Sequence, residues 1–342
     1  MSLARAIETG DLSELPSRRE EDWRWTDLRG LLRNLPPAAP VRLGVVAAGP
    51  FDEIAETIFP IVNGRGPAFI DLAAGERRAV ALRIVAADPG SSSFSLGIRL
   101  AAGAQLLLFE SHEGSAPAVC DFRLEVDVAA GARLERVLIA DQAAETISVT
   151  LAKVRLGERA EFVQTIAASG ARRQRIETEV CHSRGSTARL DGLYLVGDRR
   201  HVDLTTRVIH AAPDASTDQL AKGLAAGQGR AVFQGRVTVE SGADGADAAM
   251  GHHALLLSPR AEVDAKPELE IFAEDVACSH GNSIGALDGE ALFYAGQRGI
   301  TEAEARAMLT HAFLAEVVGR VTHGGARGIV EDWLAEQIER LV

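Results

Sequence analysis

The chain has 342 residues, a formal net charge of −12 at pH 7, 46% hydrophobic residues and 25% charged residues. This composition is ordinary for a globular protein with a full hydrophobic core. Nucleic-acid binding requires clustered lysines and arginines facing phosphates, so the acidic balance argues against that class of partner. The three cysteines are too few and too widely spaced for a disulfide framework, and we expect reduced thiols.

No segment of the sequence has the features of a membrane span or a secretory signal. No run approaches the ~18 apolar residues that a membrane helix requires. Residues 1–16 lack an apolar core and carry acidic residues early. The sequence therefore predicts a soluble, cytoplasmic protein that does not bind membranes.

Residues 1–85 are expected to form an N-terminal region of helical and mixed structure. Ser17 and Glu20 have the spacing of a capping box. Apolar residues then follow at helical spacing, at Trp25, Leu28, Leu31 and Leu32. The prolines of NLPPAAP at 34–40 end this predicted helix, because proline removes a backbone donor and restricts the preceding residue. Residues 41–85 show no clear pattern.

Residues 86–285 consist of short β-like runs that superpose at a shift of 28 residues. Small residues recur at one position of the repeat, at Ala104, Ala132, Ala160, Ala188 and Ser216. Apolar residues recur two places later, at Leu106, Leu134, Phe162 and Leu190. Such a period indicates stacked units that bury a core only by contacting their neighbours. A β-helix with one coil per repeat and a meander of two strands per repeat both fit; alanines in register favour the β-helix.

Residues 286–342 are predicted to be helical. Thr301 and Glu304 form a capping box at the start of one amphipathic helix. Its apolar stripe comprises Ala305, Met308, Leu309, Ala312, Phe313 and Val317, and a second helix has Ile329, Trp333 and Ile338 on one side. Such helices either cap the end of a β-helix or serve as a docking site for a partner.

Two motifs of common enzyme classes are absent from the sequence, the P-loop and the HExxH zinc-protease motif. The glycine-rich stretch KGLAAGQGR at 222–230 is interpreted as a loop between strands. His252 and His253 would point to opposite faces of a strand, which favours surface or core roles. His201 and Asp203 would share one face, and a solvated polar rung is favoured there over a His–Asp relay.

Cys278 and His280 form an i, i+2 pair, so on a strand both side chains leave the same face. A thiolate and an imidazole are suitable ligands for iron or zinc, but two ligands do not complete a site. Taken alone, the pair is better interpreted as a buried cysteine beside a histidine that is bonded to backbone. A metal site would need further ligands from distant residues or from a second chain.

The stretch KPELEIFAEDVACSHGNSIGALDGEALFYAGQRGI at 266–300 resembles the signature of the SufB/SufD family of iron–sulfur cluster assembly proteins. Three further segments resemble the SufD branch: SRREEDWRWTDL, DGLYLVGDRRHVDLTTRVIH and STDQLAKGLAAGQGRAVFQGRV. Ala295 stands where the SufB branch carries a cysteine. The resemblance implies a mainly β fold, with a right-handed parallel β-helix at 86–285 between N-terminal and C-terminal helical regions.

The resemblance also implies a non-catalytic scaffold subunit that pairs with a SufB-like subunit. The SufC ATPase would dock on the C-terminal helices, so that no nucleotide binds this chain directly. His280 is the implied metal ligand, with Cys278 a weaker candidate, for an iron–sulfur cluster that is held transiently and shared with SufB. The alternatives are a stand-alone homodimer that binds and delivers iron and, far less favoured, a β-helix enzyme acting on polysaccharide.

Overall fold

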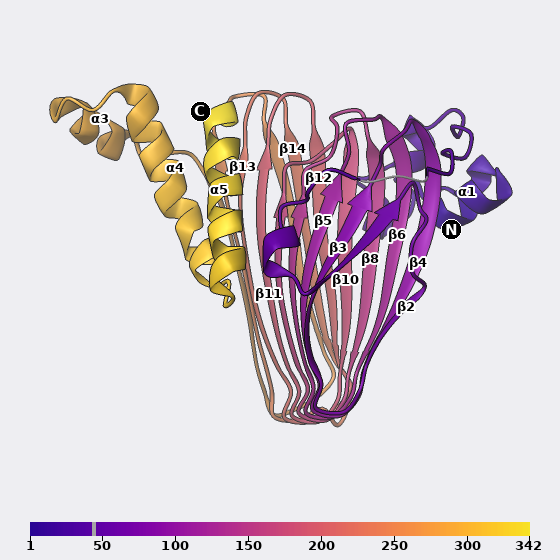
Figure 1. Cartoon of the computed structure of the whole chain (residues 1–342). Coiled ribbons are helices and arrows are strands. Elements are labelled where there is room, and N and C mark those ends of the chain that lie inside the picture. Colours follow the sequence, from indigo (N-terminus) through magenta and orange to yellow (C-terminus); the bar gives the residue numbers. More distant parts are fainter. Residues whose placement is uncertain (43–45) are drawn as a thin grey trace.

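Residues 1–42 and 46–342, which the computed structural model describes, form a parallel β-solenoid with helices at both ends (Figure 1). The odd-numbered strands form a nine-stranded sheet: β1 (Thr57–Val62), β3 (Arg77–Val85), β5 (Gln105–Glu113), β7 (Arg133–Ala140), β9 (Glu161–Ala168), β11 (Thr187–Val196), β13 (Ser216–Ala225), β15 (Ala246–Leu256) and β17 (Val276–Gly285). The even-numbered strands form an eight-stranded sheet: β2 (Phe69–Leu72), β4 (Gly90–Leu100), β6 (Ala118–Val128), β8 (Ile147–Leu156), β10 (Arg173–His182), β12 (His201–His210), β14 (Arg230–Val239) and β16 (Glu262–Ile271).

Every strand pairs in parallel with the strand two places away in the sequence, so each coil contributes one strand to each sheet. The side chains that face inward from both sheets form one continuous hydrophobic core. The solenoid expected from the sequence is therefore confirmed, and its strands begin at Thr57.

The register of the repeat changes after Phe162, so the predicted positions of Ala188, Leu190 and Ser216 are wrong. Leu106, Leu134 and Phe162 pair across successive coils as predicted. Phe162 then pairs with Ala188 instead of Leu190, because the next coil is two residues shorter. The buried column of small residues is therefore Ala104, Ala132, Ala160, Ser186, Ala215 and Ala246, each at most 1% exposed.

The helix predicted between the capping box at Ser17 and the prolines at 34–40 is wrong. Only α1 (Leu3–Thr9) and the single turn α2 (Leu28–Leu31) are α-helical, with short 3₁₀ helices at Leu12–Glu14, Glu21–Trp23 and, further on, Asp52–Ile54. The Ser17 N–H does donate to Glu20 Oε1 at 3.0 Å, but no α-helix follows that turn. Helix propensity is overridden here because Trp23 and Thr26 are held against the eight-stranded sheet.

Residues 17–28, which we call the N-terminal strap, cover polar side chains on the outer face of β10 and β12. Thr26 Oγ1 donates to Asp203 Oδ2 at 2.5 Å, and the Trp25 carbonyl oxygen lies 3.2 Å from His201 Nε2. His201 and Asp203 are consequently buried. The solvated rung predicted for this pair is wrong, because the strap removes it from water.

An ion network joins the strap to the sheet at several points. Arg175 donates to Asp203 at 2.7 Å and to Glu177 at 2.9 Å, and its guanidinium lies 4.4 Å from the Trp23 ring centroid. Three further ion pairs lie around Arg175 and connect the strap to the sheet: Arg207–Asp22 at 2.9 Å, Arg236–Asp22 at 3.6 Å and Lys266–Glu21 at 2.6 Å. The segments that resemble the SufD branch therefore converge on one contact region.

Three C-terminal helices, α3 (Gly289–Gln297), α4 (Glu302–Gly319) and α5 (Gly324–Leu341), follow the last strand. α4 and α5 lie along the outer face of the nine-stranded sheet, whereas α3 projects away from it (Figure 1). The capping box at Thr301 and Glu304 is confirmed. Leu314 and Val318 are buried in place of the exposed Met308 and Ala312 of the predicted stripe, because α4 presents a slightly rotated face to the sheet.

Lys222 lies within β13 and not in a loop, so the prediction for 222–230 holds only for the turn after Ala225. Its ammonium group donates to the Phe313 carbonyl oxygen at 3.0 Å and pairs with Glu316 at 2.6 Å. The lysine thereby fixes α4 on the sheet. None of the helices among the described residues is long and apolar enough to cross a membrane.

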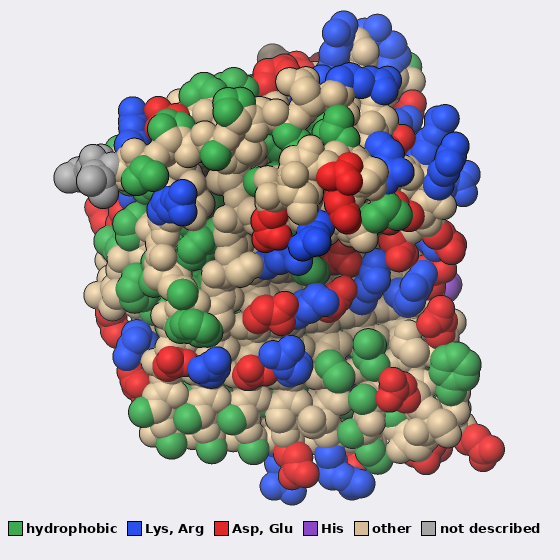
Figure 2. Space-filling view, turned by 90° about the vertical axis from the view of Figure 1, so that its right-hand side faces the viewer, with side chains coloured by type: hydrophobic (Ala, Val, Ile, Leu, Met, Phe, Trp, Pro, Cys, Tyr) green, Lys and Arg blue, Asp and Glu red, His purple; other side chains and the backbone are tan. Residues whose placement is uncertain are grey.

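Acidic and basic side chains lie next to one another on the outer surface, as Figure 2 shows for the side that bears the N-terminal helices in Figure 1. Arg155 and Asp127, for example, pair at 2.6 Å with both side chains about half exposed. Such exposed pairs contribute little to stability because water screens them. The pair therefore provides a control for the buried network under the strap.

We expect Asp203→Ala to lower the free energy of unfolding by about 3 kcal/mol, because it leaves Arg175 buried with one carboxylate partner fewer. Urea unfolding followed by circular dichroism measures the change. Asp127→Ala at the exposed pair should cost less than about 1 kcal/mol. Equal losses in the two variants would show that the buried network does not hold the strap.

Candidate functional site

The C-terminal end of the solenoid is open. β16 and β17 are the last strands of their sheets, and each pairs with only one neighbour. Their residues are exposed or half-buried, whereas β15 shows the alternation of buried and exposed residues that is typical of an internal coil. The last coil therefore presents unpaired backbone groups and partly uncovered inward-facing side chains.

Cys278 and His280 both lie on this last coil, within β17. Cys278 pairs in register with Ala248 and His280 with Met250, two buried core residues of the coil before. Both β17 side chains thus continue inward-facing columns, where Cys278 is half-buried against the core and His280 is exposed. They share one face of the strand, with Cα atoms roughly 7 Å apart. Neither side chain is fully buried in the core.

The two side chains differ in their readiness to bind a metal. Burial, and to a lesser degree the nearby Asp247, raise the pKa of the Cys278 thiol above its ordinary value. Since the thiolate is the metal-binding form, Cys278 is a poor ligand in the chain alone. The imidazole of His280 is exposed, and imidazole is the commonest metal ligand in proteins. His280 is the stronger candidate of the pair.

A series of hydrogen-bonded side chains connects the buried core to this last coil. Tyr194 Oη lies 2.9 Å from His252 Nε2, and His252 Nδ1 lies 2.7 Å from Asn282 Oδ1. Because an amide oxygen only accepts, His252 carries its proton on Nδ1 and Tyr194 donates to Nε2. A side chain at Gly223 would collide with the Tyr194 ring, so this glycine lets the tyrosine reach across β13.

His252 and His253 point to opposite faces of β15, as predicted. His252 is buried and stacks on Phe233 with ring centroids 4.6 Å apart, and both of its ring nitrogens are hydrogen-bonded. His253 faces outward, with Nδ1 2.7 Å from Ser283 Oγ. Sequence reasoning missed Asn282, although alternation from Cys278 and His280 places it on the same face.

No group of three or more His, Cys, Asp or Glu side chains within residues 1–42 and 46–342 is arranged to hold a metal ion. Cys278 and His280 lie on one strand face at the open end of the fold as two candidate donors, which are too few for a complete metal site.

Residues 84–313 match the family model described as SUF system FeS cluster assembly, SufBD core domain. That match covers about two thirds of the chain and includes β17 and most of the solenoid. The chain belongs to the SufBD family. The resemblance noted in the sequence is thereby confirmed.

Several named members of this family are similar to the chain. The iron-sulfur cluster assembly protein SufD of Escherichia coli is 32% identical over 206 residues, which are 60% of this chain and 49% of that protein. The match thus spans about half the length of the E. coli relative. A SufBD family protein of Mycobacterium bovis is 28% identical over 91% of this chain and 86% of its own length. The chloroplastic protein ABCI7 of Arabidopsis thaliana is 32% identical over 57% of this chain and 42% of its own length.

Four histidines of this SufBD chain have strongly lowered pKa values. Burial lowers the pKa of His182 to about 3, and those of His201, His210 and His252 to about 4. His182 and His210 also stack with ring centroids 4.6 Å apart, so protonation of one disfavours protonation of the other. All four are therefore neutral in the folded protein at pH 7.

We expect the protein to lose stability as the pH falls from about 6.5 towards 4. In that window the unfolded chain protonates these histidines and the folded chain does not, so each costs up to about 1.4 kcal/mol per pH unit. Urea midpoints between pH 7.5 and 5.5 measure the slope. His182→Asn with His210→Asn should flatten it, and a midpoint independent of pH would contradict the burial of neutral imidazoles.

Proposed function

We propose that the chain is a non-catalytic scaffold subunit of the cytoplasmic Suf machinery, contributing part of the site where an iron–sulfur cluster is assembled. The observation that carries this proposal is the exposed position of His280 beside Cys278 on the unpaired last coil. The nascent cluster is the cargo of this site. Membership of the SufBD family supports the assignment.

A second polypeptide completes the half-site in this proposal. β16 and β17 expose a row of unpaired backbone groups, which readily accept a further strand. A SufB-like subunit that continues the two sheets would bring its own ligands beside His280. A second copy of this chain could pair in the same way, which is the arrangement of the stand-alone iron-binding alternative.

The C-terminal helices dock the SufC ATPase in this proposal. α3 presents Phe293 and Tyr294 with 70% and 60% of their surfaces exposed, and the exposed Met308 of α4 follows. Large exposed aromatic side chains are typical anchors of protein interfaces. Nucleotide would then be hydrolysed by the partner, in agreement with the absence of a P-loop from this sequence.

The connection between α4 and α5 is fixed to the nine-stranded sheet. Arg320 pairs with Asp191 at 3.0 Å and with Asp218 at 2.6 Å, and its carbonyl oxygen accepts from Arg189 at 2.6 Å. Thr322 Oγ1 donates to Glu135. A movement of the helices, such as one driven by dimerisation of two bound ATPase subunits, would therefore be transmitted to the strands.

We expect His280→Ala to lower the yield of cluster on the complex with SufB-like and SufC-like subunits at least tenfold. Even an outer partner of a metal ligand is worth about 10–100-fold in affinity, so loss of a direct ligand should cost no less. Co-expression followed by iron and sulfide analysis measures the yield. His253→Ala, on the outward face of the neighbouring strand, is the matched control.

An unchanged cluster yield in His280→Ala would remove this histidine from the proposed site. Tight, stoichiometric iron binding by the chain alone would favour the stand-alone iron-binding alternative. Size-exclusion chromatography with metal analysis distinguishes that outcome.

We expect Phe293→Ala with Tyr294→Ala to weaken binding of a SufC-like ATPase by about 30-fold or more, because truncating a central aromatic anchor costs about 2 kcal/mol. Surface plasmon resonance with the immobilised ATPase measures the affinity. Phe69→Ala, an exposed aromatic at the other end of the solenoid, should leave the affinity unchanged. Equal affinity in all three proteins would exclude α3 as the docking element.

A further inference from the structure

A cluster of arginines lies along one edge of the solenoid, where odd-numbered strands pass into even-numbered strands. We call it the arginine groove, and its cations are Arg172, Arg173, Arg199, Arg200, Arg230 and Arg260. Three carboxylates line the same region, those of Glu145, Asp198 and Glu262. The groove is therefore locally basic on a chain whose net charge is −12.

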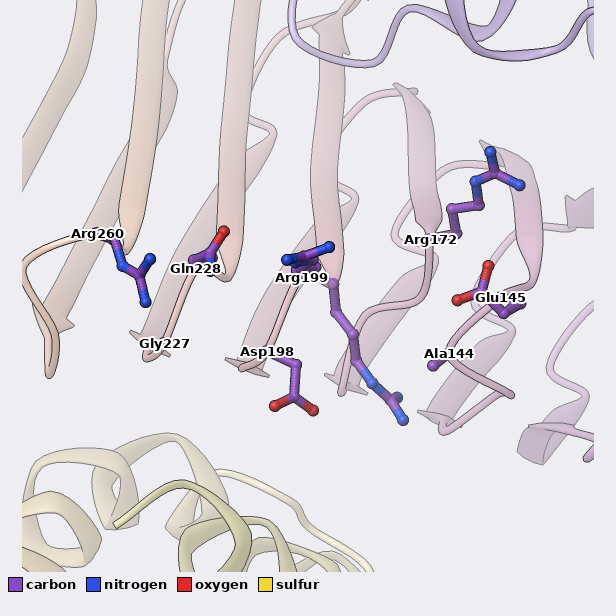
Figure 3. Close-up of a pocket in the computed structure, with 9 residues that line it drawn as sticks. Ala144, Glu145, Arg172, Asp198, Arg199, Gly227, Gln228 and Arg260 are labelled. Carbon is purple, nitrogen blue, oxygen red and sulfur yellow. The ribbon is translucent and has the colours of Figure 1, made fainter.

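The repeat of the fold places these arginines on successive coils. Gln174 pairs in register with Val202, so Arg173 and His201 stand one residue before that pair, and His201 pairs with Arg230 on the next strand. Adjacent strands lie about 4.8 Å apart, so the backbone positions of these arginines fall on neighbouring coils. Figure 3 shows Arg172, Arg199 and Arg260 on different turns along this edge, with Asp198 close to Arg199 and Glu145 close to Arg172.

Most of these cations form no ion pair with a carboxylate of the described residues. Within the described residues, no ion pair within 4.0 Å joins Arg172, Arg173, Arg199 or Arg260 to a carboxylate. Arg230 pairs with Glu262, and Arg200 lies 4.0 Å from Asp141. Elsewhere on the surface, arginines commonly face an acidic side chain, as Arg155 and Arg236 do. The groove thus holds an excess of unneutralised positive charge.

Arg173 is half-buried within the groove. Burial, followed by repulsion from Arg230 and Arg172, lowers the pKa of its guanidinium below the ordinary value. Its Nε atom is buried without a hydrogen-bond partner, while Nη1 donates only to the Arg172 carbonyl oxygen. A bound anion would supply both the missing charge and the missing acceptor.

The groove is also hollowed. Two adjoining concavities of about 720 and 560 Å³ share Arg199, Arg200, Gln228 and Arg260. Volumes of this size are typical of small-molecule sites, whereas an acidic protein surface needs no such hollow. No Phe, Tyr or Trp of the described residues lines either concavity, so there is no surface on which a base could stack.

We propose that the arginine groove binds a small molecule through a diphosphate group. Planar guanidinium forks match phosphate oxygens in bidentate pairs, and arginines on successive coils engage two linked phosphates at once. Recognition rests on the phosphates and not on what is attached to them. This site lies on a different edge from β17 and goes beyond the proposed role in cluster assembly.

Isothermal titration of the full chain with inorganic pyrophosphate, ADP and adenosine at low ionic strength tests the proposal. Pyrophosphate and ADP should bind with similar affinity, and adenosine should not bind. Arg172→Gln with Arg199→Gln and Arg260→Gln should weaken pyrophosphate binding about tenfold or more, because charge-assisted contacts are lost. All three arginines are exposed, so the variant should fold, which circular dichroism verifies.

The matched control is Arg77→Gln with Arg184→Gln, two exposed arginines on the opposite edge of the solenoid. It should bind pyrophosphate like the unaltered chain. Lack of saturable binding at millimolar pyrophosphate, or equal loss in both variants, would overturn the proposal. Tighter binding of a hexa-aspartate peptide than of pyrophosphate would also overturn it and would assign the groove to an acidic protein segment.

Discussion

Stacking of one coil on the next is the constraint on which this structure depends. Each strand obtains its backbone hydrogen bonds from the coils on either side, and each inward-facing side chain packs in a column of equivalents. A column of small residues at the turns, from Ala104 to Ala246, allows the coils to approach closely. Nothing in such a stack ends it, so its last strands, β16 and β17, have no partner strand on one side for their backbone hydrogen bonds.

The two terminal regions protect the outer faces and leave the open end free. The N-terminal strap buries the ion network around Arg175 on the eight-stranded sheet. The helices α4 and α5 cover the nine-stranded sheet and are fixed there through Lys222 and Arg320. Among the surfaces left uncovered are the last coil, the projecting α3 and the arginine groove, which expose a Cys–His pair, aromatic side chains and cations respectively.

The solenoid was predictable because its 28-residue period is a local signal, strong from Ala104 to Phe162. The predicted alignment of residues between coils failed after Phe162, because the next coil is two residues shorter and every later column is shifted. The strap was not predictable, since burial of Asp203 depends on Thr26, 177 residues away. For the site, spacing alone placed Cys278 and His280 on one strand face, but it favoured a buried cysteine beside a histidine bonded to backbone. Cys278 is half-buried and His280 is exposed because β17 is the last strand of its sheet, and no local sequence pattern indicates that.

Amide hydrogen exchange of residues 276–285, in the chain alone and in complex with a SufB-like subunit, tests most directly whether a second chain completes the open coil. An edge strand exchanges rapidly when unpaired and slowly when it gains a hydrogen-bonded neighbour. The account predicts strong protection of β17 on complex formation. Protection at β1 and β2 with no change at β17 would contradict it.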